Sequence, residues 1–249
     1  MRAKVLPGMG GRMKYAWAVL VAGWLAPGAL AQQNLFNVPS AEITPKNALF
    51  FQQQTNFNRT IQSNTTISYG FGSGFEGGLN ILSVGLLPER GVQDDSNPPL
   101  LLFNFQKGIE LSEDFKLGLG TQFGQSAPDR RVDVRLANFT YLTGVYVLPE
   151  ELGKVYVGAY FANPAYRGGT GDPFGFMLGY DLPIIKDRFS LVGDYISGRS
   201  GISVAVLGGV VQLTENWQLS LGAQLPAPRS SNAYGAVLEL TFVPGKKGD

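Results

Sequence analysis

Strict alternation of apolar and polar side chains is the clearest pattern in this sequence. Between residues 113 and 125, the apolar side chains Phe115, Leu117, Leu119 and Phe123 alternate with Lys116, Gly118, Gly120 and Gln122. Residues 216–225 repeat the pattern, with large apolar side chains separated by Gln, Ser or Gly. A period of two indicates β-strands that have one apolar face and one polar or small face.

Segments of this kind recur along the chain and predict twelve strands. They lie near residues 47–57, 64–71, 75–85, 100–110, 114–124, 134–148, 154–164, 173–183, 188–197, 202–213, 216–225 and 233–243. Short turns and longer loops tend to alternate between them. An even number of strands then brings both termini to the end that carries the short turns.

The polar faces of these strands are too small and too wet for a packed protein core. We therefore predict an all-β chain that folds as a single transmembrane antiparallel up-and-down β-barrel of about 12 strands, with its apolar face toward lipid. Such a barrel has a backbone diameter of about 24 Å, between filled eight-stranded barrels and open sixteen-stranded porins. A soluble exported β-sandwich is the alternative fold.

The first 31 residues are typical of an export signal. Four bases precede an apolar run from Tyr15 to Leu30, and Ala29-Leu30-Ala31 forms a small-x-small cleavage pattern before Gln32. We predict four parts: a signal peptide at 1–31, a periplasmic N-terminal lead-in at 32–46, the β-barrel at 47–243 and a polar C-terminal tail at 244–249. With the barrel pattern, the signal predicts location in the bacterial outer membrane.

Charge and composition narrow the function. Removal of residues 1–31 takes four of the 20 Lys and Arg and no acid, which leaves 16 bases against 19 acids. This near-neutral balance gives no support for nucleic-acid binding. The chain has no histidine and no cysteine, which excludes histidine-activated nucleophiles and Cys/His metal sites. We expect no enzymatic activity, no cofactor and no metal site.

The ends of the strands point to a family. An aromatic residue opens the strand after several short turns, as Phe75, Phe115, Phe189 and Trp217 do, and such residues form girdles in transmembrane barrels. The last strand runs from Tyr234 to Phe242 and has a glycine followed by alternating large residues. In these features the chain resembles the bacterial outer-membrane β-barrel family of small, porin-like proteins. The resemblance implies contact with outer-membrane lipid and insertion by the barrel-assembly machinery.

The polar faces of the predicted strands supply a candidate pore lining with charges of both signs. The predicted lumen residues are Glu76, Asn80, Asn104, Gln106, Glu110, Lys116, Gln122, Asn138, Lys154, Tyr160, Asp181, Asp194, Gln218, Gln224 and Glu239. Such a set is able to form a polar pore for small solutes or a salt-bridged interior that blocks passage.

Arginines gather in the predicted outer loops. The candidate residues of the extracellular mouth are Arg59, Arg90, Arg130, Arg131, Arg135, Arg167, Arg199 and Arg229. Arginine makes bidentate contacts with phosphate and carboxylate groups. Two interpretations remain open: these side chains bind lipid phosphates or attract anions, or they pair with nearby loop acids such as Asp133 and Asp172.

A small, narrow, porin-like channel for small solutes is the function that the sequence favours. The alternative is a non-conducting barrel with a structural, adhesive or lipid-binding role. A transporter of hydrophobic molecules is a third class, and it requires an N-terminal plug and an apolar lumen. The sequence identifies neither the solute nor the oligomeric state.

Overall fold

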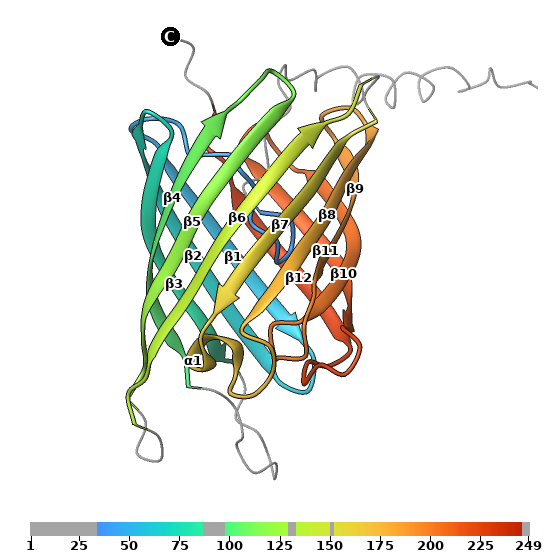
Figure 1. Ribbon diagram of the computed structural model, residues 1–249. Coiled ribbons are helices and arrows are strands. Elements are labelled where there is room, and N and C mark those ends of the chain that lie inside the picture. Colours follow the sequence, from blue (N-terminus) through green and yellow to red (C-terminus); the bar gives the residue numbers. More distant parts are fainter. Residues whose placement is uncertain (1–33, 87–97, 129–132, 150–151, 246–249) are drawn as a thin grey trace, which may run out of the picture.

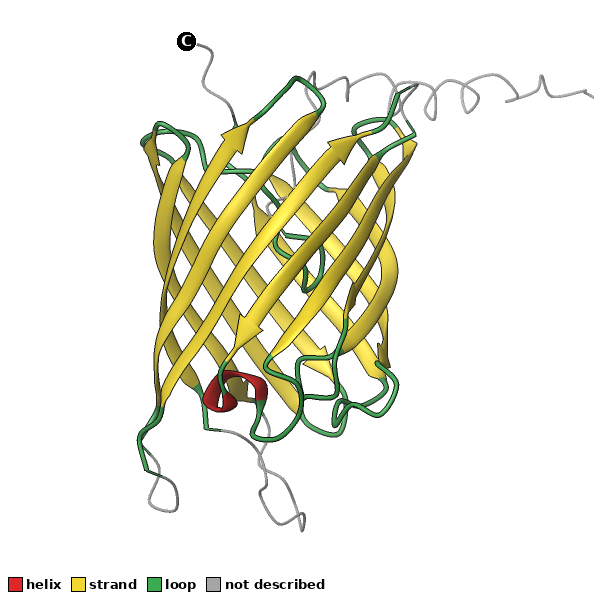
Figure 2. Cartoon of the chain, in the orientation of Figure 1, coloured by secondary structure: helices red, strands yellow, loops and turns green. Residues whose placement is uncertain are grey.

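Twelve strands close into one barrel in the computed structural model, which describes residues 34–86, 98–128, 133–149 and 152–245 (Figures 1 and 2). The strands are β1 (Leu49–Phe57), β2 (Ile61–Gly72), β3 (Phe75–Gly85), β4 (Leu100–Glu110), β5 (Phe115–Ser126), β6 (Leu136–Val147), β7 (Lys154–Ala162), β8 (Phe174–Ile185), β9 (Phe189–Ile196), β10 (Val204–Gln212), β11 (Trp217–Pro226) and β12 (Gly235–Phe242). A short helix, α1 (Pro164–Arg167), lies between β7 and β8. No helix among the described residues is long and apolar enough to cross a bilayer.

Every strand pairs antiparallel with its neighbours in sequence, and β1 pairs with β12 to close the sheet. The closing register places Gln53 opposite Leu240. Closure leaves no unpaired strand edge, so the backbone polar groups of the wall bond to one another. The prediction of a single antiparallel up-and-down barrel of twelve strands is confirmed.

The two ends of the barrel differ. The short connections at 73–74, 111–114, 186–188 and 213–216 and the described residues of the connection at 148–153 lie at one end, together with the end of β12 (top of Figure 1). We call this the turn end. The longer connections and α1 lie at the opposite end, which we call the loop end. The tightest hairpin joins β2 to β3 through Ser73 (φ 53°) and Gly74 (φ 74°), since the turns that match strand twist require positive φ.

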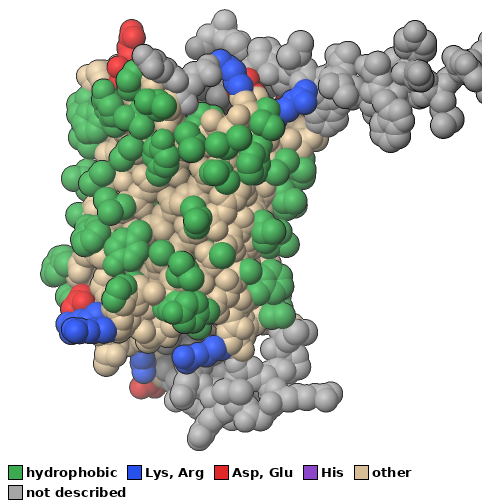
Figure 3. Space-filling model, turned by 90° about the vertical axis from the view of Figure 1, so that its right-hand side faces the viewer, with side chains coloured by type: hydrophobic (Ala, Val, Ile, Leu, Met, Phe, Trp, Pro, Cys, Tyr) green, Lys and Arg blue, Asp and Glu red, His purple; other side chains and the backbone are tan. Residues whose placement is uncertain are grey.

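The outer wall of the barrel is apolar. Outward positions carry Phe103, Leu119, Phe176, Leu207 and Leu221, each at least half exposed. The space-filling view shows apolar side chains spread over the face of the wall turned to the viewer, with Lys, Arg, Asp and Glu gathered at the two ends (Figure 3). The apolar faces of β5 and β11 thus lie on the outer wall, as the alternation of the sequence predicted.

One predicted lumen residue lies on the outer wall instead. Its neighbours along β6, Ala137 and Phe139, are buried inside the barrel. Asn138 therefore lies on the same face as Leu136, which is exposed outside. Its side chain donates a hydrogen bond to the outward Thr121 (3.2 Å). The prediction was wrong because β6 has aromatic and polar residues on both faces, so the period of two did not indicate which face was the inner one.

Residues 34–46, which precede β1, enter the barrel rather than lying outside it. We expected residues 32–46 to form a periplasmic lead-in. In the structure, residues 34–46 run through the lumen before β1 begins, and the loop they form is visible inside the barrel (Figure 2). We call residues 34–46 the inserted segment. Leu35, Phe36, Val38 and Ala41 of this segment are buried, because they pack in one cluster with inward side chains of the wall formed by β6–β12.

Candidate functional site

The inserted segment begins with a tight turn that a carboxylate of β9 holds. The backbone N–H of Leu35 bonds to the carbonyl of Val38 (3.0 Å). Asp194 Oδ2 accepts hydrogen bonds from the backbone N–H groups of Asn37 and Val38, the latter at 3.0 Å. One inward side chain therefore satisfies two backbone donors that the segment brings into the interior.

The segment then crosses to the opposite wall and bonds to β3 and β4. Gln106 Nε2 donates to the carbonyl of Ser40 (2.8 Å). Glu76 Oε2 accepts from both the backbone N–H (2.7 Å) and the hydroxyl (2.8 Å) of Thr44. Because buried backbone groups need partners, these inward polar side chains fix the path of the segment across the lumen.

Paired glycines make room for this crossing. Gly108 of β4 and Gly118 of β5 face each other in register. A Cβ at Gly118 would lie 2.9 Å from Ala41 Cα, and one at Gly108 would lie 3.0 Å from the carbonyl oxygen of Ala41. Gly108 and Gly118 therefore allow the close approach of a second backbone.

The wall formed by β6–β12 is largely apolar where the segment packs. The inward side chains there include Val145, Tyr156, Met177, Val192, Val206, Val210 and Val237, and they form one cluster with the apolar side chains of the segment. The segment covers this surface, so it is not free for a hydrophobic ligand. An apolar lumen open to hydrophobic substrates, which the third function class requires, is not observed in the described part of the barrel.

A cluster of charged side chains near the turn end also attaches the inserted segment to the wall. Glu42 of the segment lies 3.1 Å from Lys116 Nζ and 3.5 Å from Lys154 Nζ. Lys116 also lies 3.3 Å from Glu110. Burial by itself raises the pKa of Glu42, but the charges and hydrogen bonds of Lys154 and Lys116 outweigh it, so the pKa lies below its ordinary value of 4.5.

This ion pair predicts a pH-dependent attachment of the segment. A carboxylate with a lowered pKa in the folded state stabilises that state above its ordinary pKa and ceases to do so as pH falls through the lowered pKa. At neutral pH we expect Glu42→Gln to speed backbone amide exchange in residues 35–45 by about three- to tenfold, as for the loss of roughly 1 kcal/mol. The ratio of exchange rates between the variant and the wild type should approach one below the lowered pKa. A ratio that does not change with pH would exclude this role for Glu42.

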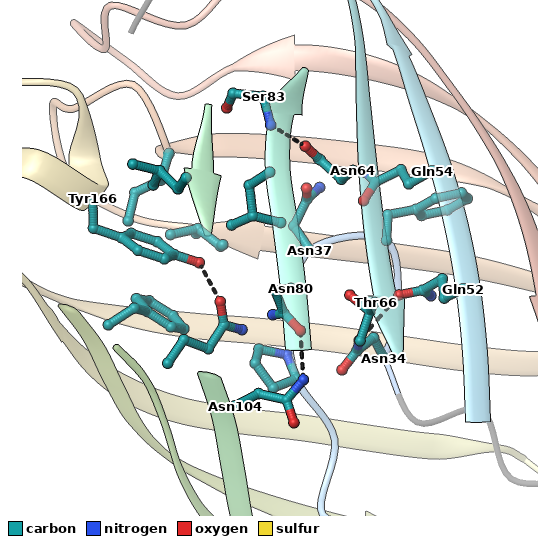
Figure 4. A pocket seen from close by; sticks show the side chains of 18 of the residues that line it. Asn34, Asn37, Gln52, Gln54, Asn64, Thr66, Asn80, Ser83, Asn104 and Tyr166 are labelled. Atoms are coloured by element: carbon teal, nitrogen blue, oxygen red, sulfur yellow. Dashed lines mark hydrogen bonds between the residues drawn. The ribbon is translucent and has the colours of Figure 1, made fainter. Parts of the chain in front are cut away.

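Two cavities enter the barrel from opposite ends. The first, of about 260 Å³, opens toward the loop end and is lined mainly by Asn and Gln side chains, with the aromatic residues Phe36, Phe139, Tyr141 and Tyr166 (Figure 4). We call it the amide-lined cavity. The second, of about 340 Å³, lies at the turn end among charged residues that include Lys154, Asp181 and Arg188. The inserted segment contributes residues to the first cavity only, and no residue lines both.

The predicted lumen residues divide into groups. The amide-lined cavity contains Glu76, Asn80, Asn104, Gln106, Gln122 and Gln224. The cavity at the turn end contains Lys154, Asp181 and Gln218. Lys116, Asp194 and Glu239 face the inserted segment or lie buried in the wall around it. Tyr160 points inward and donates to the carbonyl of Ser197 (2.7 Å), while Glu110 is exposed at the turn end. Asn138, as described above, faces outward.

Sequence reasoning missed the amide-rich wall formed by β1 and β2. Gln52, Gln54, Asn56, Asn64 and Thr66 all line the amide-lined cavity. Amides and hydroxyls occupy both faces of these strands, so the alternation of side chains did not indicate which residues face the lumen. The density of Asn, Gln and Thr between residues 52 and 66 was the available signal.

The loop arginines have several environments. Arg199 makes two hydrogen bonds to Asp172, at 2.8 and 3.0 Å, and these hold the pKa of Asp172 below its ordinary value. Arg167 is buried in its loop and donates to the carbonyl of Gly171. Arg199 thus pairs with a loop acid, as the second interpretation expected, whereas Arg167 bonds to a backbone carbonyl. Arg59, Arg135 and Arg229 lie in connections at the loop end, and Arg90, Arg130 and Arg131 lie outside the described residues.

Comparison with known proteins gives a match in structure only. No protein-family model matches the chain, and no curated protein matches it in sequence. The KdgM porin superposes with a TM-score of 0.57 over 79% of this chain and 99% of its own, at 9% sequence identity. The chain has the fold of this porin. The KdgM porin in complex with disordered oligogalacturonate gives a TM-score of 0.55 with the same coverage and identity.

The similarity to the porin concerns the fold alone, since function resides in the side chains placed on a fold and 9% identity preserves few of them. The N-terminal β-barrel domain of Pseudomonas aeruginosa OprF also matches, at 14% identity over 79% of this chain and 97% of its own. Its TM-score of 0.22 is too low to indicate a shared fold.

Proposed function

We propose that this protein is a narrow, porin-like channel of the bacterial outer membrane, whose lumen the inserted segment constricts. One observation carries the proposal: a polar cavity and a cavity lined by charged and apolar residues enter a closed, lipid-compatible barrel from opposite ends, and the inserted segment passes through the lumen between the two walls. A twelve-stranded barrel is wider than the eight-stranded barrels whose interior is just filled by side chains, and narrower than open sixteen-stranded porins. We therefore expect removal or displacement of the segment to leave a water-filled path for small solutes.

Location in the outer membrane rests on the outer wall and on the export signal predicted at residues 1–31. An exterior of exposed Leu, Phe and Ile is costly in water and favourable in hydrocarbon. In this location the loop end faces outward and the turn end faces the periplasm, and the barrel-assembly machinery is the expected partner during insertion.

The lipid-facing wall yields a stability prediction. Leu221 is 60% exposed at the middle of β11. We expect Leu221→Arg to lower the free energy of unfolding in lipid vesicles by about 2–4 kcal/mol, because a charge at mid-membrane loses its hydration. Glu215→Arg, in the exposed turn before β11, is the control and should change it by less than about 0.5 kcal/mol. Equal effects in the two variants, measured by denaturant titration, would contradict a membrane position for this wall.

The solute of the KdgM porin complex does not transfer directly to this chain. Oligogalacturonate is a polyanion, and a polyanion requires basic groups along its path. Among the described residues that line the amide-lined cavity there is no Lys and no Arg. We therefore propose a channel for small solutes that does not select polyanions.

Ion current through the purified protein in a planar lipid bilayer tests the channel. The expected result is discrete, small current steps for the wild type, with weak selectivity between anions and cations. The alternative function, a non-conducting barrel, is favoured by the burial of Leu35 and Val38 inside the lumen. Absence of current both in the wild type and in a variant that lacks the inserted segment would establish that alternative.

A further inference from the structure

The amide-lined cavity has a chemical character that differs from the rest of the lumen. Of the described residues that line it, Glu76 alone carries a formal charge, and that carboxylate already accepts two hydrogen bonds from Thr44. The other lumen charges, such as Lys116, Lys154 and Asp194, are engaged with the inserted segment. An anionic solute would leave water without meeting a counter-charge, and a cationic solute would meet only Glu76, whose carboxylate is already bonded to Thr44, so either transfer is costly. A neutral solute avoids that penalty.

The polar groups of the cavity are of the kind that bind hydroxyl groups. A carboxamide offers two donors and two acceptor sites, and a hydroxyl offers one donor and two acceptor sites. Gln54 donates to Asn56 (3.2 Å), and Asn104 donates to Asn80, so donors and acceptors lie side by side around the space shown in Figure 4. Adjacent hydroxyl groups on a solute need such alternating donors and acceptors.

Aromatic side chains form part of the same cavity. Tyr166 of α1 stacks on Phe139 of β6, with ring centroids 4.9 Å apart and an interplanar angle of 12°. The Tyr166 hydroxyl donates to Gln122 Oε1 (3.0 Å), which anchors the ring beside the amides. A wall with both aromatic surface and fixed amides matches a solute that has apolar C–H faces and hydroxyl edges.

We propose that the amide-lined cavity is a binding site for neutral, hydroxyl-rich solutes of the size of simple sugars. This inference rests on the proposed function, since it assigns the class of solute that the channel takes. The cavity volume of about 260 Å³ and its opening toward the loop end suit capture of a small solute before it reaches the inserted segment.

Three sugars that share one ring test the proposal: glucose is neutral, glucuronate is anionic and glucosamine is cationic at about pH 6. Their binding to the wild-type protein in detergent is measured by ligand-observed NMR, which requires no conductance. We expect glucose to bind more tightly than either charged sugar. The same order is expected for their reduction of ion current in the bilayer.

Neighbouring glutamines on one strand provide matched variants. Gln54 points into the cavity, whereas Gln53 points outward and bonds to Thr65 on the outer wall (2.7 Å). Gln54→Leu should weaken glucose binding by about three- to tenfold, as for the loss of one or two hydrogen bonds, while Gln53→Leu should leave it unchanged. Gln54→Lys should shift the preference toward glucuronate. Circular dichroism verifies that each variant keeps its strand content.

The outcomes separate this inference from the proposed function. Equal or weaker binding of glucose relative to the charged sugars overturns the inference, even if the protein conducts ions. The same holds if Gln53→Leu and Gln54→Leu weaken binding equally. Preferential glucose binding that responds only to changes at Gln54 supports the site, and it does so even if the bilayer shows no current and the channel proposal fails.

Discussion

Replacement of residues 35–45 by a Gly/Ser sequence of equal length is expected to raise the single-channel conductance of the reconstituted protein severalfold. The replacement removes the apolar side chains that pack on the β6–β12 wall and the carboxylate of Glu42, which pairs with Lys116 and Lys154. Without these contacts the segment no longer stays in the lumen, and the two cavities join into one passage. Stepwise current in planar bilayers, recorded at the same voltage and salt as for the wild type, measures the change.

The same replacement should lower the thermal stability of the barrel. Each large apolar side chain of the segment contributes roughly 1.5–3 kcal/mol by its burial, and its loss also exposes the valines beneath it. Strand content must nevertheless persist, since the twelve-strand hydrogen-bonded wall does not include the segment. A variant with intact strands and unchanged conductance would show that the constriction of the lumen lies elsewhere.

Gly118→Val is expected to displace the inserted segment without any change in the segment itself. A Cβ at this position would lie 2.9 Å from Ala41 Cα and 3.0 Å from the carbonyl oxygen of Ser40, both of them backbone atoms that cannot rotate away. The clash favours a state in which the segment leaves the lumen. We therefore expect higher conductance and faster amide exchange of residues 35–45 than in the wild type.

Gly193→Val is the matched control for this substitution. Gly193 faces the outer wall in β9, where a Cβ would lie 3.3 Å from the end of the Leu207 side chain, which is able to move. It should leave both conductance and exchange in the segment close to the wild-type values. If Gly118→Val behaves like Gly193→Val in both measurements, the close packing of the segment on β5 does not hold it in place.

Periodicity predicted the barrel well because the orientation of side chains along a strand is a local property. Eleven of the fifteen predicted lumen residues line one of the two cavities or make hydrogen bonds or ion pairs with the inserted segment. The predicted orientation was wrong for Asn138, because both faces of β6 carry aromatic and polar residues. Alternation gave no orientation for Gln52 and Gln54, because amides follow one another along β1. Local alternation carries no information at positions where both faces have the same chemistry.

The sequence by itself determined the strands, their order and the apolar exterior, because each of these follows from neighbours a few residues apart and from short connections. Only the tertiary structure showed that residues 34–46 pass through the lumen. The partners of that segment lie far along the chain: Thr44 bonds to a residue 32 positions away, and Val38 to one 156 positions away. The segment has no period of its own, so its place depends on the space, the glycines and the polar groups that the closed barrel brings together.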